Sequence, residues 1–165
     1  MMKISAFNII NTAVLIILLN VFVFSSGNYG FAAENIITGE ARAIDGQTLA
    51  IGLTTIRLYG IQTPKLDRKC KWPKKLIPCG EISRTALLDL IAASSVRCQI
   101  KKNLISSQTE YKFAICSVGG FDVARNMVHT GWAISAKNDP AGYKQTEARA
   151  RKANRGLWRG TFDIQ

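Results

Sequence analysis

Alternation of apolar and polar residues over residues 37–61 constrains the fold of this chain more than any other feature of its sequence. The stretches ITGEARAID (37–45) and TLAIGLTTIRLYGI (48–61) repeat with a period of two residues, which is typical of half-buried β-strands. Turn residues at Asp45-Gly46 and at Gly52 divide this region into three segments. The pattern therefore predicts a meander of three strands.

The second half of the chain combines helical periodicity with two further strands. Residues 79–94 (CGEISRTALLDLIAAS) predict a helix, because apolar side chains recur three and four residues apart. Its apolar stripe consists of Ile82, Ala86, Leu87, Leu90 and Ile91. Residues 95–103 and 110–118 alternate again and predict two strands, the second followed by a turn at Gly119-Gly120.

Two more helices are predicted near the C-terminus. A short helix covers residues 122–131, with Asp122 as its N-terminal cap and Gly131 at its C-terminus. The last helix lies within residues 139–158. The residues expected on its inner side and at its stop are Tyr143, Ala150, Ala153 and Gly156. Five short strands interrupted by a helix are compatible with an α+β fold, a small closed β-barrel of the OB type with three helices.

Residues 1–33 differ from the rest of the chain, because Lys3 is the only charged residue among them. A basic start, the apolar run AVLIILLNVFVF and small residues at the end predict a signal peptide cleaved near Ala32 or Ala33. A membrane anchor is the alternative, but the uninterrupted apolar core is shorter than the ~20 residues of a spanning helix. We expect residues 34–165 to form one exported domain, periplasmic or extracellular, without a later transmembrane segment.

A strong excess of basic residues follows the predicted signal peptide. From residue 34 onward the chain has 21 Lys and Arg residues against 11 Asp and Glu, a net charge of +10. The basic residues concentrate in two clusters: Lys65, Arg68, Lys69, Lys71, Lys74 and Lys75, and then Arg149, Arg151, Lys152, Arg155 and Arg159. Such a surface attracts nucleic acid, acidic polysaccharide or anionic lipid, although a solvated basic surface without a partner has the same composition.

All four cysteines lie in the exported part, and an even number in a secreted chain predicts disulfides. Three pairings are possible. We expect Cys70–Cys79 and Cys98–Cys116, because each closes a local loop between neighbouring elements. A zinc site is the competing interpretation. The sequence does not favour zinc, because it has no C-x-x-C spacing and only one histidine, His129, which we expect on a helix surface.

Five motifs follow one another between Ile36 and Trp158. They are IDGQTL, IRLYGIQTPKLDRKC, the CG that opens the first helix, VGGFDVARNMVHTGWA and EARARKANRGLW. Their order and spacing resemble those of staphylococcal nuclease homologues (the thermonuclease family), in particular a secreted, disulfide-bearing bacterial branch. The resemblance implies an SNase-like OB-fold domain. Some members of that branch occur in exopolysaccharide loci, so a cell-envelope protein that interacts with acidic exopolysaccharide is one alternative.

The resemblance also implies a site for calcium-dependent phosphodiester cleavage. In the family, two aspartates and a backbone carbonyl hold the metal, a glutamate assists the attacking water, and two arginines contact the phosphate. Arg57 and the Thr63 carbonyl match this pattern. The first of the two metal-binding aspartates belongs to a turn of the form D-G-D-T, where Gln47 stands at the third position of Asp45-Gly46-Gln47-Thr48. Gln62 and Lys65 stand at the aspartate and glutamate of a D-T/A-P-E motif.

The remaining family positions are also altered. The second arginine belongs to a Y-G-R stretch, where this chain has Tyr111 or Lys112. Calcium affinity depends on carboxylates, and a lysine ammonium is neither a calcium ligand nor a base at neutral pH. The resemblance therefore implies no cofactor and little or no nuclease activity. The alternative is an active phosphodiesterase that uses calcium and a displaced acid such as Asp45 or Asp67.

These replacements make the predicted pocket neutral or cationic, which favours direct binding of a polyanion such as nucleic acid or acidic polysaccharide. The predicted binding residues are Arg57, Lys65, Arg68, Lys69 and Lys112. The alternative is that the site residues changed by evolutionary drift and the pocket binds no ligand. We expect a monomer. Four aromatic residues are expected to pack in the core, namely Tyr59, Phe113, Trp132 and Trp158. Tyr111 and Trp72 are the candidates for base stacking.

The signal peptide is directly testable. We expect protein recovered from the periplasm or medium to begin near Glu34, which intact-mass measurement and N-terminal sequencing would show. Full-length protein retained in the membrane fraction would instead support the anchor.

Overall fold

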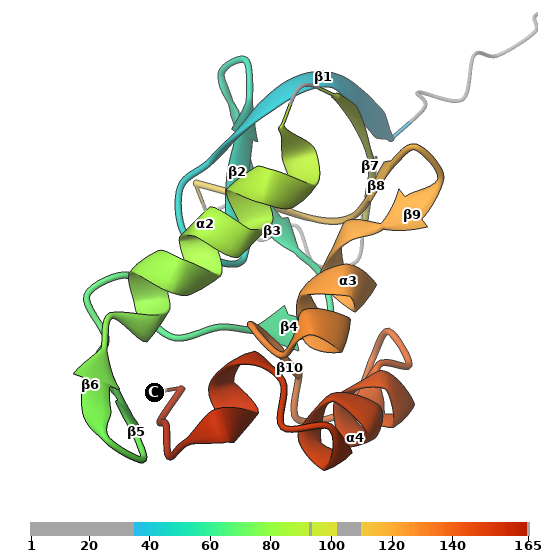
Figure 1. Cartoon of the computed structure of the whole chain (residues 1–165). Helices are drawn as coiled ribbons and strands as arrows, with labels where there is room; N and C mark the ends of the chain where they lie inside the picture. Colours follow the sequence, from blue (N-terminus) through green and yellow to red (C-terminus); the bar gives the residue numbers. More distant parts are fainter. Residues whose placement is uncertain (1–34, 93, 102–109, 165) are drawn as a thin grey trace, which may run out of the picture. The chain divides into compact units, whose positions relative to one another are not determined.

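Five strands close into a barrel in a computed structural model of the chain, which describes residues 35–92, 94–101 and 110–164. The strands are β1 (Ile36–Ala43), β2 (Thr48–Ile51), β3 (Thr54–Leu58), β7 (Ser95–Ile100) and β8 (Lys112–Val118). They pair in the order β3-β2-β1-β7-β8, and parallel pairing of β3 with β8 completes the ring (Figure 1). The predicted α+β barrel is confirmed.

The barrel interior follows from the alternation in the sequence. In β7, for example, Val96, Cys98 and Ile100 are buried, and the residues between them are exposed. Leu49, Ile56 and other side chains of β1–β3 and β8 fill the same core. Full burial of a large aliphatic side chain contributes about 1.5–3 kcal/mol, so this shared interior is the main source of stability.

The described residues contain the α-helices α2 (Cys79–Ile91), α3 (Val123–Thr130) and α4 (Lys144–Lys152). Helices α2 and α3 pack on the barrel, and α4 packs on α3 and β10. A 3-10 helix, η2 (Gly156–Arg159), follows α4. Helix α2 runs across the barrel strands, and α3, α4 and η2 gather where β4 and β10 pair (Figure 1). The predicted caps of α3 are confirmed, because the Asp122 carboxylate accepts the Arg125 N–H at 3.0 Å and Gly131 adopts a left-handed conformation with φ of 80°.

The predicted end of the last helix is wrong. Tyr143 and Ala150 are buried as expected, but Ala153 is exposed. Helix α4 ends at Lys152, before Gly156, which instead begins η2. A Cβ on Gly156 would lie 2.6 Å from the backbone of Gly131, so close backbone packing explains this glycine. The first helix is also shorter than residues 79–94, because it ends at Ile91.

Five very short strands add to the barrel. β4 (Ile61–Gln62) pairs with β10 (Ile134–Ser135), β5 (Cys70–Trp72) pairs with β6 (Lys75–Ile77), and β9 (Phe121–Asp122) extends β8. Segments of two or three residues contain no measurable periodicity, so the sequence did not predict them. The β4–β10 pair matters most, because it joins the barrel to the α4 region.

Both predicted disulfides are confirmed. Cys98 and Cys116 lie directly opposite each other in β7 and β8, with their Cα atoms 4.0 Å apart. Cys70 in β5 is bonded to Cys79, the first residue of α2, and this bond closes the β5–β6 hairpin. The predicted signal peptide lies outside the described residues. Within the described part, no helix is long and apolar enough to cross a membrane.

The number of free thiols tests the two disulfides. We expect the exported protein to contain no alkylatable thiol in denaturant and four after reduction, as measured by mass spectrometry. Reduction should lower the free energy of unfolding by about 2–4 kcal/mol per disulfide, because it relaxes the unfolded chain. Four thiols without reductant would contradict the pairing.

Candidate functional site

The turn before β2 forms one wall of the candidate site, and its position depends on Gly46. A Cβ at this residue would lie 2.1 Å from the Ser83 Oγ of α2, so a side chain cannot be accommodated without movement. Ser83 is itself fixed, because its hydroxyl donates to the Trp132 carbonyl at 2.7 Å. The close contact between turn and helix therefore sets where Asp45 and Gln47 lie.

The side chain of Gln47 connects this turn to two strands. With the amide oriented to satisfy its neighbours, its oxygen accepts from Arg57 Nη2 at 2.5 Å and its nitrogen donates to the Ile61 carbonyl at 3.2 Å. The backbone N–H of Gln47 donates to Asp45 Oδ1 at 2.7 Å. Asp45 thus acts as a turn-forming acceptor, and Gln47 holds the arginine.

Arg57 has a second neighbour, Tyr111, which directly precedes β8. Its Nη1 donates to the Tyr111 hydroxyl at 3.4 Å, and its guanidinium carbon lies 5.3 Å from the centre of the Tyr111 ring. Phe113 packs edge-on against Tyr111, with 5.4 Å between ring centres. Contacts from the residues just before β2 and just before β8 therefore restrict the orientation of the guanidinium.

A short loop after β4 forms the opposite wall. Gln62 and Lys65 are exposed, and Thr63 between them is buried. The Lys65 carbonyl accepts the Arg68 N–H at 2.9 Å, which turns the chain. A Cβ on Gly80 would lie 1.9 Å from the Lys65 carbonyl oxygen, so the glycine at the start of α2 lets the loop approach closely.

Together these walls enclose a pocket of about 230 Å³. Its lining residues are Asp45, Gln47, Arg57, Gln62, Thr63, Pro64, Lys65, Leu66 and Ile164. The structure thus brings together Gln47, Arg57, Gln62 and Lys65, which the sequence had placed at family site positions. Ile164 was missed, because its sequence position gives no signal that the C-terminal segment returns to this pocket.

Other predicted residues lie elsewhere. Arg68, Lys69, Lys112 and Asp67 do not line this pocket. Trp72 is half-buried against the C-terminal segment, where a Cβ on Gly160 would lie 2.9 Å from its ring, so it is a poor stacking candidate.

The predicted core role of the aromatic residues holds for only part of the set. Trp132 packs on the core. Tyr59 and Phe113 are half-buried and line a second pocket of about 310 Å³ beside Arg57. Trp158 is half-buried against Phe162, with 5.0 Å between ring centres. His129 is exposed on α3, as predicted, and its ring lies against Arg155.

The lining of the pocket does not fit the calcium ion that the family site would hold. Asp45 supplies the only carboxylate of the pocket lining, and one of its oxygens accepts the Gln47 N–H. The Gln47 amide oxygen faces Arg57, and Lys65 adds a positive charge. Among the described residues, no three His, Cys, Asp or Glu side chains converge on a metal position. Calcium needs several oxygen ligands and is strongly favoured by carboxylates.

Comparison with known families identifies the family of this domain. A family model described as staphylococcal nuclease homologue matches residues 55–160, which covers β3 to η2. The chain belongs to the staphylococcal nuclease family. No curated protein matched the sequence. The matched region includes Arg57, Gln62 and Lys65 but begins after Gln47, which the hydrogen bond to Arg57 places in the same pocket.

Restoring the acids tests this assignment of positions. We expect no calcium binding by the unmodified protein in isothermal titration calorimetry, and measurable binding after Gln47→Asp, Gln62→Asp and Lys65→Glu are combined, because three carboxylates then surround the pocket. The control changes Gln99→Asp, Gln145→Asp and Lys74→Glu alter the net charge equally at exposed positions. Failure of the restored variant to bind calcium, with its fold intact, would contradict the assignment.

The missing second arginine can be added to the restored variant. Because the Tyr111 hydroxyl lies 3.4 Å from Arg57 Nη1, we expect Tyr111→Arg to raise calcium-dependent DNase activity, measured by oligonucleotide cleavage. Lys112→Arg serves as the control, since exposed Lys112 lies opposite Ile56 in the β3–β8 pairing rather than opposite Arg57. A larger gain from the change at Lys112 would contradict this choice between the two positions.

Proposed function

We propose that this protein is an exported member of the staphylococcal nuclease family that binds nucleic acid without calcium and has lost most or all hydrolytic activity. The binding pocket is the one that contains Arg57 and Lys65. Family membership supports nucleic acid as the ligand. The two disulfides and the signal-like N-terminus support export.

The arrangement of Arg57 is the observation that carries the proposal. Gln47 and Tyr111 hold the guanidinium from two sides, and both are neutral, so its positive charge is not cancelled by these partners. Lys65 adds a second cation to the same lining. A guanidinium with restricted orientation binds phosphate oxygens with little loss of side-chain freedom. The pocket therefore suits a phosphodiester group directly, without a bridging metal.

The same lining supports the loss of catalysis. Hydrolysis needs a group that accepts a proton from the attacking water, and Lys65 occupies the glutamate position. Each missing catalytic element commonly costs orders of magnitude in rate. Together the missing acids leave the scaffold with phosphate binding as its remaining function.

An active phosphodiesterase is the second candidate, and the position of Asp45 favours it over a general drift of the site. Asp45 lines the pocket, whereas Asp67 does not. However, one carboxylate oxygen of Asp45 already accepts the hydrogen bond from the Gln47 N–H within the turn. Calcium-dependent cleavage of DNA or RNA by the unmodified protein would favour this candidate over the proposal.

Binding can be tested by fluorescence titration with single-stranded DNA at several salt concentrations. We expect Arg57→Gln to weaken binding about tenfold or more, in line with the ~1.5–3 kcal/mol of a charge-assisted hydrogen bond. The slope of log affinity against log salt should decrease by about 0.7. Arg42→Gln is the charge-matched control, because Arg42 is exposed on β1 and outside the pocket lining.

Two results would contradict the proposal. Equal effects of Arg57→Gln and Arg42→Gln would mean that the pocket is not the binding site. Tighter binding of an acidic polysaccharide than of DNA, with the same dependence on Arg57, would assign the pocket to the exopolysaccharide alternative.

A further inference from the structure

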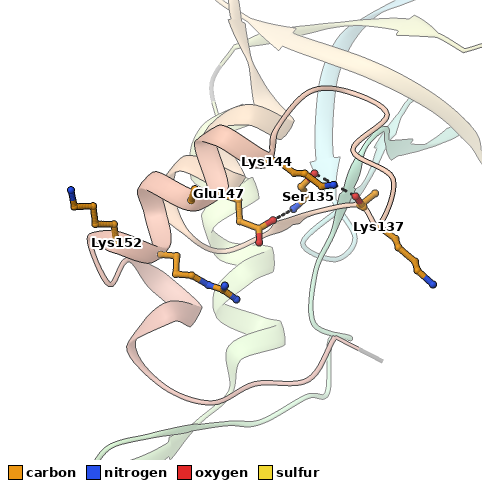
Figure 2. A pocket seen from close by; sticks show the side chains of 8 residues that line it. Ser135, Lys137, Lys144, Glu147 and Lys152 are labelled. Carbon is orange, nitrogen blue, oxygen red and sulfur yellow. Dashed lines mark hydrogen bonds between the residues drawn. The ribbon is translucent and has the colours of Figure 1, made fainter.

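A groove of about 510 Å³ lies between β10 and α4, outside the family site. Its charged and polar lining residues are Ser135, Lys137, Lys144, Glu147, Arg151 and Lys152. Lys137 and Lys152 extend on opposite sides of the groove, and Glu147 points toward Ser135 between them (Figure 2). Four cations against one carboxylate give this groove a clear positive charge.

The acidic groups of this region are engaged by the protein itself. Glu147 Oε2 accepts the backbone N–H of Ser135 at 2.7 Å, which joins α4 to β10. Asp139 accepts the Ser135 hydroxyl at 2.7 Å and the backbone N–H of Lys144 at 3.2 Å. The Ser135 hydrogen bond in particular holds the pKa of Asp139 below its usual range, so this carboxylate stays ionised and fixed.

The cations are less engaged, although the charge of Lys144 contributes to lowering the pKa of Asp139. The structure, within its described residues, contains no ion pair to Lys137, Lys144, Arg151 or Lys152. The Arg151 guanidinium lies 4.3 Å from the centre of the Trp158 ring, which restricts its orientation without neutralising its charge. The groove therefore contains one oriented guanidinium and three exposed lysines.

The groove adjoins a pocket that contains Arg57, because the two share one lining residue. Ala136 lines both this groove and the 310 Å³ pocket that contains Arg57, Tyr59 and Phe113. That second pocket shares Gln47, Arg57 and Gln62 with the family site. Ser135 pairs with Ile61 and Ile134 pairs with Gln62, so β10 at the groove lies next to β4, whose residues line the second pocket.

This path combines the two features that non-specific single-strand binding requires. Basic side chains at both ends can follow a phosphate backbone, and the aromatic side chains of Tyr59 and Phe113 lie between them. An acidic polysaccharide would use the cations but has no aromatic bases to stack between them.

We infer that the groove between β10 and α4 is a second phosphate-binding site and that a single strand of nucleic acid several nucleotides long spans it and the Arg57 pocket. This inference rests on the proposed function, because the same strand occupies both sites. OB barrels bind about 4–16 nucleotides, a range compatible with a path of this kind.

The length of the oligonucleotide separates the two sites. The combined changes Lys137→Gln, Lys144→Gln and Lys152→Gln should weaken binding of dT12 about tenfold and decrease its salt slope by about 2, at about 0.7 per phosphate contact. Binding of dT2, whose single phosphodiester can contact Arg57 without reaching the groove, should change less than about twofold. Arg57→Gln should weaken binding of both oligonucleotides.

The control changes Lys71→Gln, Lys74→Gln and Lys75→Gln remove the same charge from the exposed face of the β5–β6 hairpin, and thermal melting checks the fold of each variant. If the groove variant binds dT12 like the hairpin control while Arg57→Gln still weakens binding, the inference fails and the proposed function stands. If Arg57→Gln has no effect on dT2, the proposed function fails. Weaker binding of a polyuronate alone in the groove variant would overturn the assignment to nucleic acid.

Discussion

Parallel pairing between β3 and β8 is the interaction on which the rest of this structure depends. It closes the barrel, because the other strands form an open antiparallel sequence from β3 through β2, β1 and β7 to β8. It also aligns Arg57 with Phe113, so that the adjacent Tyr111 reaches the guanidinium. Stability and the geometry of the candidate site therefore have a common origin in one strand pair.

The candidate site combines a barrel of the staphylococcal nuclease family with a cationic pocket lining. Gly46 and Gly80 allow the turn and the loop to approach α2 closely. The lining has amide and ammonium groups beside the single carboxylate of Asp45, and Gln47 forms a hydrogen bond with Arg57. The same geometry can position a metal-bound phosphate or a directly bound one. The charges of the lining residues therefore decide whether the scaffold can catalyse hydrolysis.

Cationic surface is distributed in a way that composition alone does not show. The two basic clusters of the sequence meet where the Arg159 guanidinium lies 5.4 Å from the centre of the Trp72 ring in the β5–β6 hairpin, whereas Arg151 and Lys152 face Lys137 across a groove. Lys137 lies outside both clusters in the sequence and joins the groove because β10 pairs with β4. The charge density at a site therefore depends on strand pairing as much as on the number of basic residues in the sequence.

The sequence by itself determined the barrel and the disulfide pairs, and it pointed to the residues that line the candidate pocket. Strand and helix periods are local, the cysteines lie in neighbouring elements, and Gln62 and Lys65 belong to one contiguous motif. Only the tertiary structure decided that Gln47 holds Arg57, that Ile164 returns to the pocket and that Lys137 faces α4. These contacts join residues far apart in the chain, and their formation depends on barrel closure and on two-residue strands that leave no local pattern.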